Sequence, residues 1–268
     1  MYDNMCKFLA ETFPTDFASW LLGKPIPLTE LQPSELSTEP IRADSLIFLT
    51  SAEIILHLEF QTTTDENMPL RMLDYWVRLR RKFPTKKIQQ TVIYLRPTNS
   101  PLASQTIYAS DSTSHQFQII RLWEQSPQIL EQYQGLLPFL PLCQTTDPEE
   151  ELRQVSQRLE TIPDPATKAN LLAATYVISG LALETEVIQR LLRQELMKES
   201  VTYQEILREG EAKGLARGKA EGKAEGKAEG KVETAKQIAI NMLRAGMSVE
   251  LIAQFTGLTA EQIQRLNG

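Results

Sequence analysis

Three polar residues on two neighbouring predicted strands have the types and spacing of a metal site. The segment 53–61, EIILHLEFQ, alternates side chains so that Glu59 and Gln61 point to the same face of one strand. Asp44 lies in the predicted strand 42–49, and the short turn between the two segments favours a hairpin that brings Asp44 beside them. Two carboxylates and an amide oxygen form the incomplete oxygen shell that Mg²⁺ accepts. Such an ion activates water and neutralises phosphodiester charge; ordinary strand-end acids are the alternative.

The same residues carry a resemblance to a known superfamily. Arg42-Ala43-Asp44, followed after fourteen residues by Glu59-Phe60-Gln61, resembles the site of the PD-(D/E)xK nucleases. The segments DNMCKFLAE, HLEFQT, YWVRLRRKF and VIYLRP are similar to the Rpn family, recombination-promoting nucleases also labelled as candidate transposases. The resemblance covers residues 1–145 well and the remainder in general style.

This resemblance implies a DNA endonuclease that depends on Mg²⁺, with Mn²⁺ as a substitute. Asp44 and Glu59 would hold the metal, Gln61 would occupy the place of the superfamily lysine, and Glu11 matches an acid that often completes such sites. A neutral Gln61 cannot supply positive charge to the developing phosphate, so catalysis would depend more on the metal. The alternative is a catalytically weak nuclease fold that serves as a DNA-binding or assembly module. We see no second catalytic core for strand transfer.

A basic helix is predicted directly after the strand with Glu59. Seven basic residues fall within positions 71–87, with Asp74 as the only acid. The helical period places three of these basic side chains and one tyrosine on a face opposite an apolar stripe, where they would contact DNA phosphates: Arg71, Arg78, Lys82 and Tyr75. A solvated basic face is the alternative.

His57 shares the predicted face of Glu59. It would serve as a general base or as a partner that orients Glu59 without contacting the metal. A packed strand histidine with a hydrogen-bonded ring is the more frequent case.

The order of predicted elements indicates an α/β fold, a PD-(D/E)xK-like nuclease core with a helical C-terminal extension. A first helix ends at Pro14, and a second begins with Thr15 as N-cap and ends at Gly23. A helix over 69–83 lies among four strands, 42–49, 53–61, 89–97 and 115–124. The chain then divides into a nuclease domain (1–145), a helical extension (146–207), a Gly-Lys-Ala-Glu repeat (208–232) and a helical hairpin (233–268).

The repeat and the tail have separate properties. Glycines recur every four residues from Gly210 to Gly230, which predicts a marginal helix or spacer, or else a segment ordered by a second chain in a homodimer through the C-terminal helices. In the tail, Ser248 and Thr259 are predicted N-caps, with stops at Gly246 and Gly257, in a helix-turn-helix layout. Residues 232–268 carry three basic and three acidic side chains, so packing or oligomerisation is favoured over DNA contact.

Composition indicates a cytoplasmic protein that does not bind membranes. The net charge is −6 and the pI is about 5.2, which argues against a coat of positive charge for non-specific nucleic-acid binding. Cys6 and Cys143 lie in apolar stretches, which is typical of a reducing compartment. No stretch approaches 18 apolar residues.

Overall fold

The structure is a computed structural model that describes residues 2–31, 46–192, 204, 208, 234–243, 245 and 247–264. The chain separates into two compact units, Met1–Leu207 and Arg208–Gly268. Asp44, the stop predicted at Gly246 and nearly all of the repeat 208–232 lie outside the described residues. Within the described ranges, no helix combines the length and apolarity needed to cross a bilayer.

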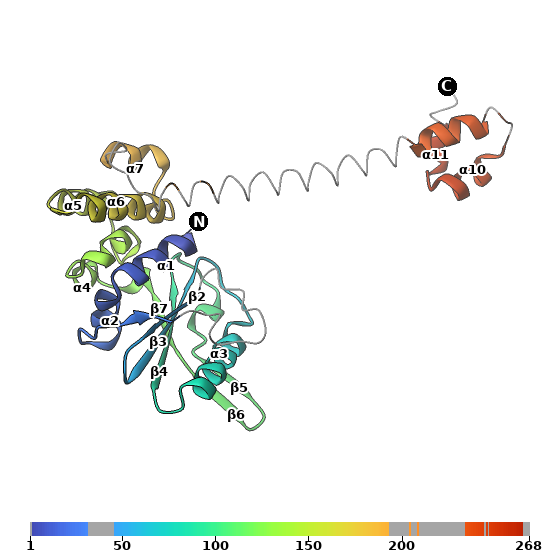
Figure 1. The fold of residues 1–268 in the computed structure, drawn as a ribbon. Helices are drawn as coiled ribbons and strands as arrows, with labels where there is room; N and C mark the ends of the chain where they lie inside the picture. The colour runs from blue at the N-terminus through green and yellow to red at the C-terminus, as the bar shows by residue number, and fades with distance from the viewer. Residues whose placement is uncertain are drawn as a thin grey trace. The chain divides into compact units, whose positions relative to one another are not determined.

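The first unit is built on a five-stranded mixed sheet in the order β1-β2-β3-β4-β7 (Figure 1). Its strands are β1 (Thr29–Glu30), β2 (Leu46–Thr50), β3 (Ile54–Gln61), β4 (Lys87–Tyr94) and β7 (Gln118–Arg121). β1, β2 and β3 pair antiparallel, whereas β3, β4 and β7 pair parallel. Helix α3 (Met68–Lys82) makes the crossover between the parallel strands β3 and β4. The predicted α/β class is confirmed, and so is the hairpin predicted between segments 42–49 and 53–61, which is formed by β2 and β3.

Two predicted boundaries are wrong. The N-cap of the second helix is Phe13, two residues earlier than the predicted Thr15, because Pro14 fits the first turn, where its missing N–H is not needed. The predicted strand 115–124 is divided between two sheets: β6 (Thr113–Gln116) pairs with β5 (Ile107–Ser110), and β7 begins at Gln118. Phe117, between them, is buried in a cluster with Met68 and Met72, which fixes the point where the chain changes sheet.

The two faces of the sheet are covered by different helices. Leu56, Leu58 and Phe60 point to one face, which we call the apolar face, and they join the largest core. That core also contains residues of α1 (Tyr2–Thr12), α2 (Pro14–Leu22), α5 (Pro148–Glu160), α6 (Pro165–Ser179), α7 (Thr185–Leu191) and the 3₁₀ segment η4 (Gln134–Leu142). Short turns η2 (Pro101–Ser104), η3 (Leu122–Glu124) and α4 (Pro127–Leu130) connect these elements.

α3 covers the opposite face, which we call the α3 face (Figure 1). Ile55 of β3 packs there against Tyr75 and Leu79. The helices predicted after residue 145 are present as α5, α6 and α7, and they share the core of the sheet within one compact unit.

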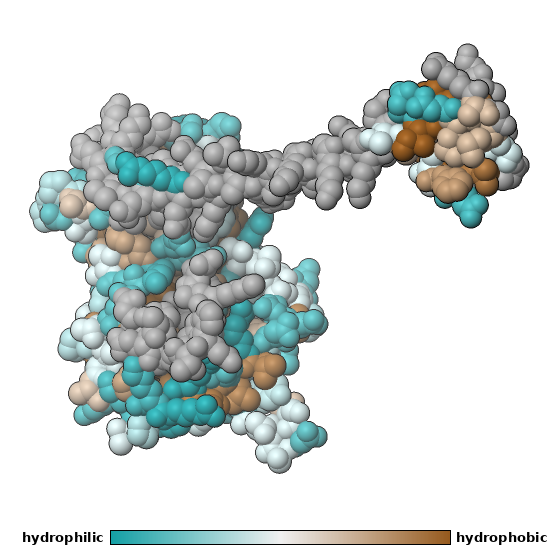
Figure 2. Space-filling view, turned by 45° about the vertical axis from the view of Figure 1, so that its right-hand side comes forward, coloured by the Kyte–Doolittle hydropathy of each residue, from teal (hydrophilic) through white to brown (hydrophobic). Residues whose placement is uncertain are grey.

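The C-terminal unit contains a helix over 234–243, α10 (Val249–Thr256) and α11 (Ala260–Gln264), around a core of Ala239, Ile252, Leu258 and Ile263. The Ser248 hydroxyl accepts a hydrogen bond from the backbone of Leu251, Thr259 and Gln262 bond reciprocally, and Gly257 has φ 72°. The predicted caps and the stop at Gly257 are therefore confirmed. Apolar side chains also reach the surface of this unit, and Phe255 is 70% exposed (Figure 2).

Candidate functional site

Glu59 is buried at the carboxyl end of β3. It stands between Leu46 of β2 and Val92 of β4, and only 1% of its surface is exposed. Alternation along β3 places it on the α3 face together with His57 and Gln61. The Gln61 amide donates a hydrogen bond to Glu59 Oε2 at 3.2 Å. The structure therefore brings two of the predicted site residues together, at the strand end where α/β sheets usually hold ligands.

Arg71 compensates the buried charge of Glu59. Its Nε lies 3.8 Å from Glu59 Oε1, and its terminal nitrogen donates to Asp65 Oδ2 at 3.0 Å. His57 Nε2 approaches the same Glu59 oxygen at 3.9 Å. Within the described chain, Arg71 Nε and His57 Nε2 are buried without a hydrogen-bond partner. A carboxylate is thus buried with one cation and one imidazole close to it.

A buried amide determines the protonation of His57. The Gln90 side-chain nitrogen donates to the carbonyl of Met72 at 2.8 Å, and a carbonyl can only accept, so the amide orientation is fixed. The same nitrogen lies 2.8 Å from His57 Nδ1, which must therefore accept, and the proton of His57 is on Nε2. Gln90 Oε1 accepts from His115 Nε2 at 2.6 Å. The result is a polar chain from His115 through Gln90 and His57 toward Glu59.

His57 stays neutral in this environment. Burial lowers its pKa to about 3, with further lowering by the charge of Arg71 and by His115. Its Nδ1 lone pair is occupied by Gln90 and its Nε2 carries a proton, so the ring has no free lone pair for a general base. The packed, hydrogen-bonded interpretation of His57 is the one that fits.

Tyr75 is not on the outer face of α3, and this prediction is wrong. The residue is 7% exposed, and its ring packs edge-on against Phe48 and His57. Burial raises the pKa of its hydroxyl, and the charge of Glu59 raises it further. Met72 and Leu79 flank Tyr75 at helical spacing, so all three belong to the buried stripe of α3.

The basic residues of α3 extend away from Glu59. α3 is the crossover between two parallel strands, so it runs back along the sheet, antiparallel to β3. Arg71 at its start is therefore the residue beside Glu59, whereas Lys82, eleven residues later, lies about 16 Å farther along the helix axis. Arg78, between them, pairs with Asp74 at 2.9 Å. Among the basic residues predicted to bind DNA, Arg71 is thus the one nearest to the Glu59 carboxylate along the described helix.

Glu11 lies on the other side of the sheet. Its carboxylate pairs with Lys7 at 3.4 Å and interacts with Glu30 of β1. Glu30 stands opposite Leu49, which stands opposite Leu56, so Glu30 belongs to the apolar face rather than to the face of Glu59. The structure does not bring Glu11 to Glu59, contrary to the expectation for a third metal ligand. Among the described residues, no three His, Cys, Asp or Glu side chains gather in a way that could hold a metal ion.

The pair formed by Glu11 and Glu30 gives a prediction about pH. Burial, opposed by Lys7, and the nearby Glu30 raise the pKa of Glu11 from 4.5 to about 7. The folded chain therefore binds this proton more tightly than the unfolded chain, so its contribution to stability is complete below pH 4.5 and is lost as the pH rises toward 7. We expect the melting temperature of Glu11→Gln to depend less on pH between 4.5 and 7 than that of the parent chain. The exposed Glu186→Gln is the control and should keep the parental dependence of melting temperature on pH. The same dependence in Glu11→Gln would contradict the raised pKa of Glu11.

A polar cavity of about 560 Å³ opens beside Gln61. Its lining comes mainly from the segment between β3 and α3: Asp3, Phe60, Gln61, Thr62, Thr63, Thr64, Asp65, Glu66, Asn67 and Arg71. Sequence reasoning missed Asp65 and Gln90. The signal for Gln90 was the pair of adjacent glutamines in a strand, since alternation obliges one of them to point to a covered face.

One comparison with known proteins finds a match. Residues 232–268 match the model of the C-terminal HTH domain of the Rpn/YhgA-like nuclease family. No curated protein and no solved structure matches the chain. The matched residues include α10 and α11, with the Ser248 cap and the turn at Gly257, so the predicted helix-turn-helix layout agrees with the match. This similarity suggests DNA binding and supports a relationship of the chain to the Rpn nuclease family.

Proposed function

We propose that this chain is a metal-dependent DNA endonuclease of the Rpn type, with a PD-(D/E)xK-like core in its first unit. The observation that carries the proposal is the buried Glu59 with the partly buried Gln61 bonded to it, at the carboxyl end of β3 and beside an open polar cavity. The match of the tail to a domain of a nuclease family supports the same function independently. A role in promoting recombination, and a homodimer through the C-terminal helices, are part of this proposal.

The donor atoms on this face are suited to Mg²⁺ or Mn²⁺. Carboxylate and amide oxygens are the ligands that these ions prefer, and Glu59 and Gln61 supply one of each from one strand. Asp44, fifteen positions before Glu59 in the sequence, is the proposed second carboxylate. The bound ion would supply an activated water and charge neutralisation at the phosphodiester.

Arg71 is positioned to supply the charge that Gln61 lacks. Its guanidinium borders the same cavity as Gln61 and lies 3.8 Å from the Glu59 carboxylate. A guanidinium can donate two parallel hydrogen bonds to a phosphate, which an amide cannot do with positive charge. We propose that Arg71 contacts the scissile phosphate, that Arg78 and Lys82 bind phosphates farther along the duplex, and that Tyr75 contributes only from its buried position beside Glu59.

The test is cleavage of supercoiled plasmid by the purified full chain. We expect nicked or linear product with Mg²⁺ or Mn²⁺ and none with excess chelator, because the proposed chemistry requires the ion. Product that is insensitive to chelator would exclude the metal-dependent mechanism.

A nuclease fold that binds DNA without cutting it is the second candidate. Two observations favour it. The Gln61 amide donates its hydrogen bond to Glu59 rather than facing an open ligand position, and the tail resembles an HTH domain. For this candidate, DNA binding persists while neither Mg²⁺ nor Mn²⁺ raises the melting temperature. A metal-dependent rise in melting temperature together with cleavage favours the endonuclease.

A further inference from the structure

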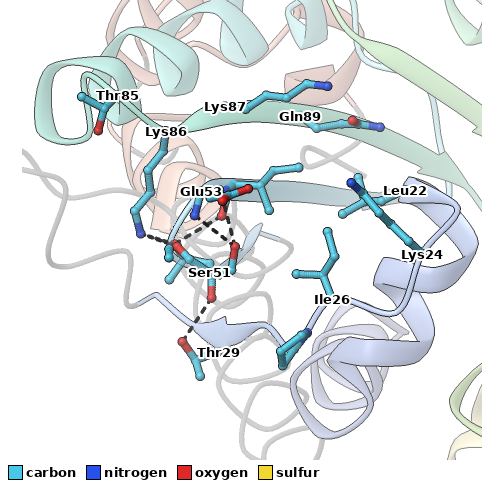
Figure 3. Close-up of a pocket in the computed structure, with 14 residues that line it drawn as sticks. Leu22, Lys24, Ile26, Thr29, Ser51, Glu53, Thr85, Lys86, Lys87 and Gln89 are labelled. Atoms are coloured by element: carbon cyan, nitrogen blue, oxygen red, sulfur yellow. Dashed lines mark hydrogen bonds between the residues drawn. The ribbon is translucent and has the colours of Figure 1, made fainter.

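A second cavity of the first unit lies at the opposite end of β3 from Gln61. Its volume is about 900 Å³, within the range of pockets that hold small molecules. The turn between β2 and β3, the start of β4 and the segment after α2 surround it (Figure 3). Ile54, at the start of β3, lines the cavity, whereas Glu59 lies five residues further along the same strand, about 16 Å away. This cavity is therefore distinct from the candidate nuclease site.

Positive charge dominates the lining of this cavity. Lys24, Lys86 and Lys87 face a single acid, Glu53. Among the described residues, none of the three lysines forms an ion pair with a carboxylate. The excess of two positive charges equals the charge of a phosphate monoester near neutral pH.

One of these cations is already held in place. Lys86 Nζ donates to Thr50 Oγ1 at 2.8 Å and to the carbonyl of Ser51 at 2.6 Å, and it lies 5.1 Å from the centre of the Phe83 ring. The loop that carries Lys86 is fixed in turn, because Arg80 donates to the carbonyls of Pro84 and Lys86. The cation therefore loses little freedom when an anion binds.

Apolar side chains also line the cavity. They belong to Leu22, Ile26, Pro27 and Ile54, and Figure 3 shows Ile26 between the Lys24 segment and the β2–β3 turn. A cavity lined by both cationic and apolar side chains fits an organic phosphate better than a free inorganic ion. We propose that this cavity binds a phosphate monoester that carries an apolar or aromatic body, with a nucleoside monophosphate as the best-fitting class.

Binding of AMP to the full chain, measured by isothermal titration calorimetry, tests the proposal. We expect AMP to bind at least about 10-fold more tightly than either adenosine or inorganic phosphate, because only AMP can contact both the lysines and the apolar side chains. Lys24→Ala/Lys87→Ala should weaken AMP binding by about 10-fold or more, the range for loss of a charge-assisted hydrogen bond. Arg81→Ala is the matched control, since it removes an exposed cation from outside the lining. Ile26→Ser should weaken AMP binding and leave phosphate binding unchanged.

Several results would overturn the proposal. Absence of AMP binding would exclude the proposed site. Equal affinities for AMP and adenosine would exclude a role of the lysines, and equal affinities for AMP and phosphate would exclude a role of the apolar side chains. Full AMP binding by the folded double variant would exclude the lysines. Binding of a DNA duplex alone, lost in the double variant, would assign the lysines to a nucleic-acid surface instead. Since Glu59 is not part of this cavity, Glu59→Gln should bind AMP normally, and failure of the nuclease proposal leaves this test unaffected.

Discussion

Glu59→Gln should lower metal-dependent plasmid cleavage by at least about 100-fold. The substitution keeps the size of the side chain and removes the one charge that a divalent ion would require at the end of β3. Loss of a residue that merely supports a metal ligand costs about 10- to 100-fold, so loss of a ligand should cost more. The measurement is the initial rate of plasmid nicking at saturating Mg²⁺, together with the melting temperature of the variant.

The control for this experiment is Glu186→Gln, an exposed substitution on α7 that changes the net charge equally. It should cleave at the parental rate. A Glu59→Gln chain that is folded and fully active would remove Glu59 from the mechanism. Because Glu59 is buried beside Arg71, its neutral form leaves the guanidinium with less compensation, so a fall in melting temperature is expected as well.

Gln90→Leu should destabilise the first unit strongly. Gln90 is 4% exposed, and its loss leaves the Met72 carbonyl, His57 Nδ1 and His115 Nε2 without their shared partner. Unsatisfied buried polar groups cost about 1–3 kcal/mol each, and partial relaxation brings the expected total to about 3–5 kcal/mol. For a unit of this size the melting temperature should fall by roughly 10 °C.

Gln154→Leu separates this effect from the general cost of replacing glutamine by leucine. Gln154 is exposed on α5, and its amide contacts only Glu150 in the same helix. Its melting temperature should change by no more than about 2 °C, the range of ordinary surface substitutions. Equal stability of Gln90→Leu and Gln154→Leu would show that the polar chain behind Glu59 contributes little.

Local signals predicted the elements that position the site. The alternation in β3, the hairpin to β2 and the extent of α3 all follow from periodicity and from turn residues, which act over a few positions. The caps of the tail followed for the same reason, since Ser248 bonds a backbone group only three residues away. The pairing of Glu59 with Gln61 needed no more than the two-residue period of a strand.

Contacts between distant segments could not be predicted in this way. The burial of Tyr75 depends on Phe48, a residue 27 positions earlier, and the run of basic residues around Tyr75 favoured the wrong face of the helix. The first helix could have covered either face of the sheet, and its buried residues share one core with Leu56 and Phe60, which places Glu11 on the far side from Glu59. Gln90 acquires its role from two histidines on different strands.

The central place of β3 in the sheet has a consequence for how binding entropy is distributed. β3 has a strand on each side, and every one of its residues except Gln61 is buried. The Glu59 carboxylate therefore loses its positional freedom once, when the chain folds, and not again at each encounter with a ligand. The adjoining cavity is bordered instead by the segment 62–67, which lies outside the regular elements until Asn67. A charge fixed by the sheet is thus set beside a lining that is held by side-chain hydrogen bonds, such as those that Asp65 accepts from Arg71 and from the backbone of Asn67.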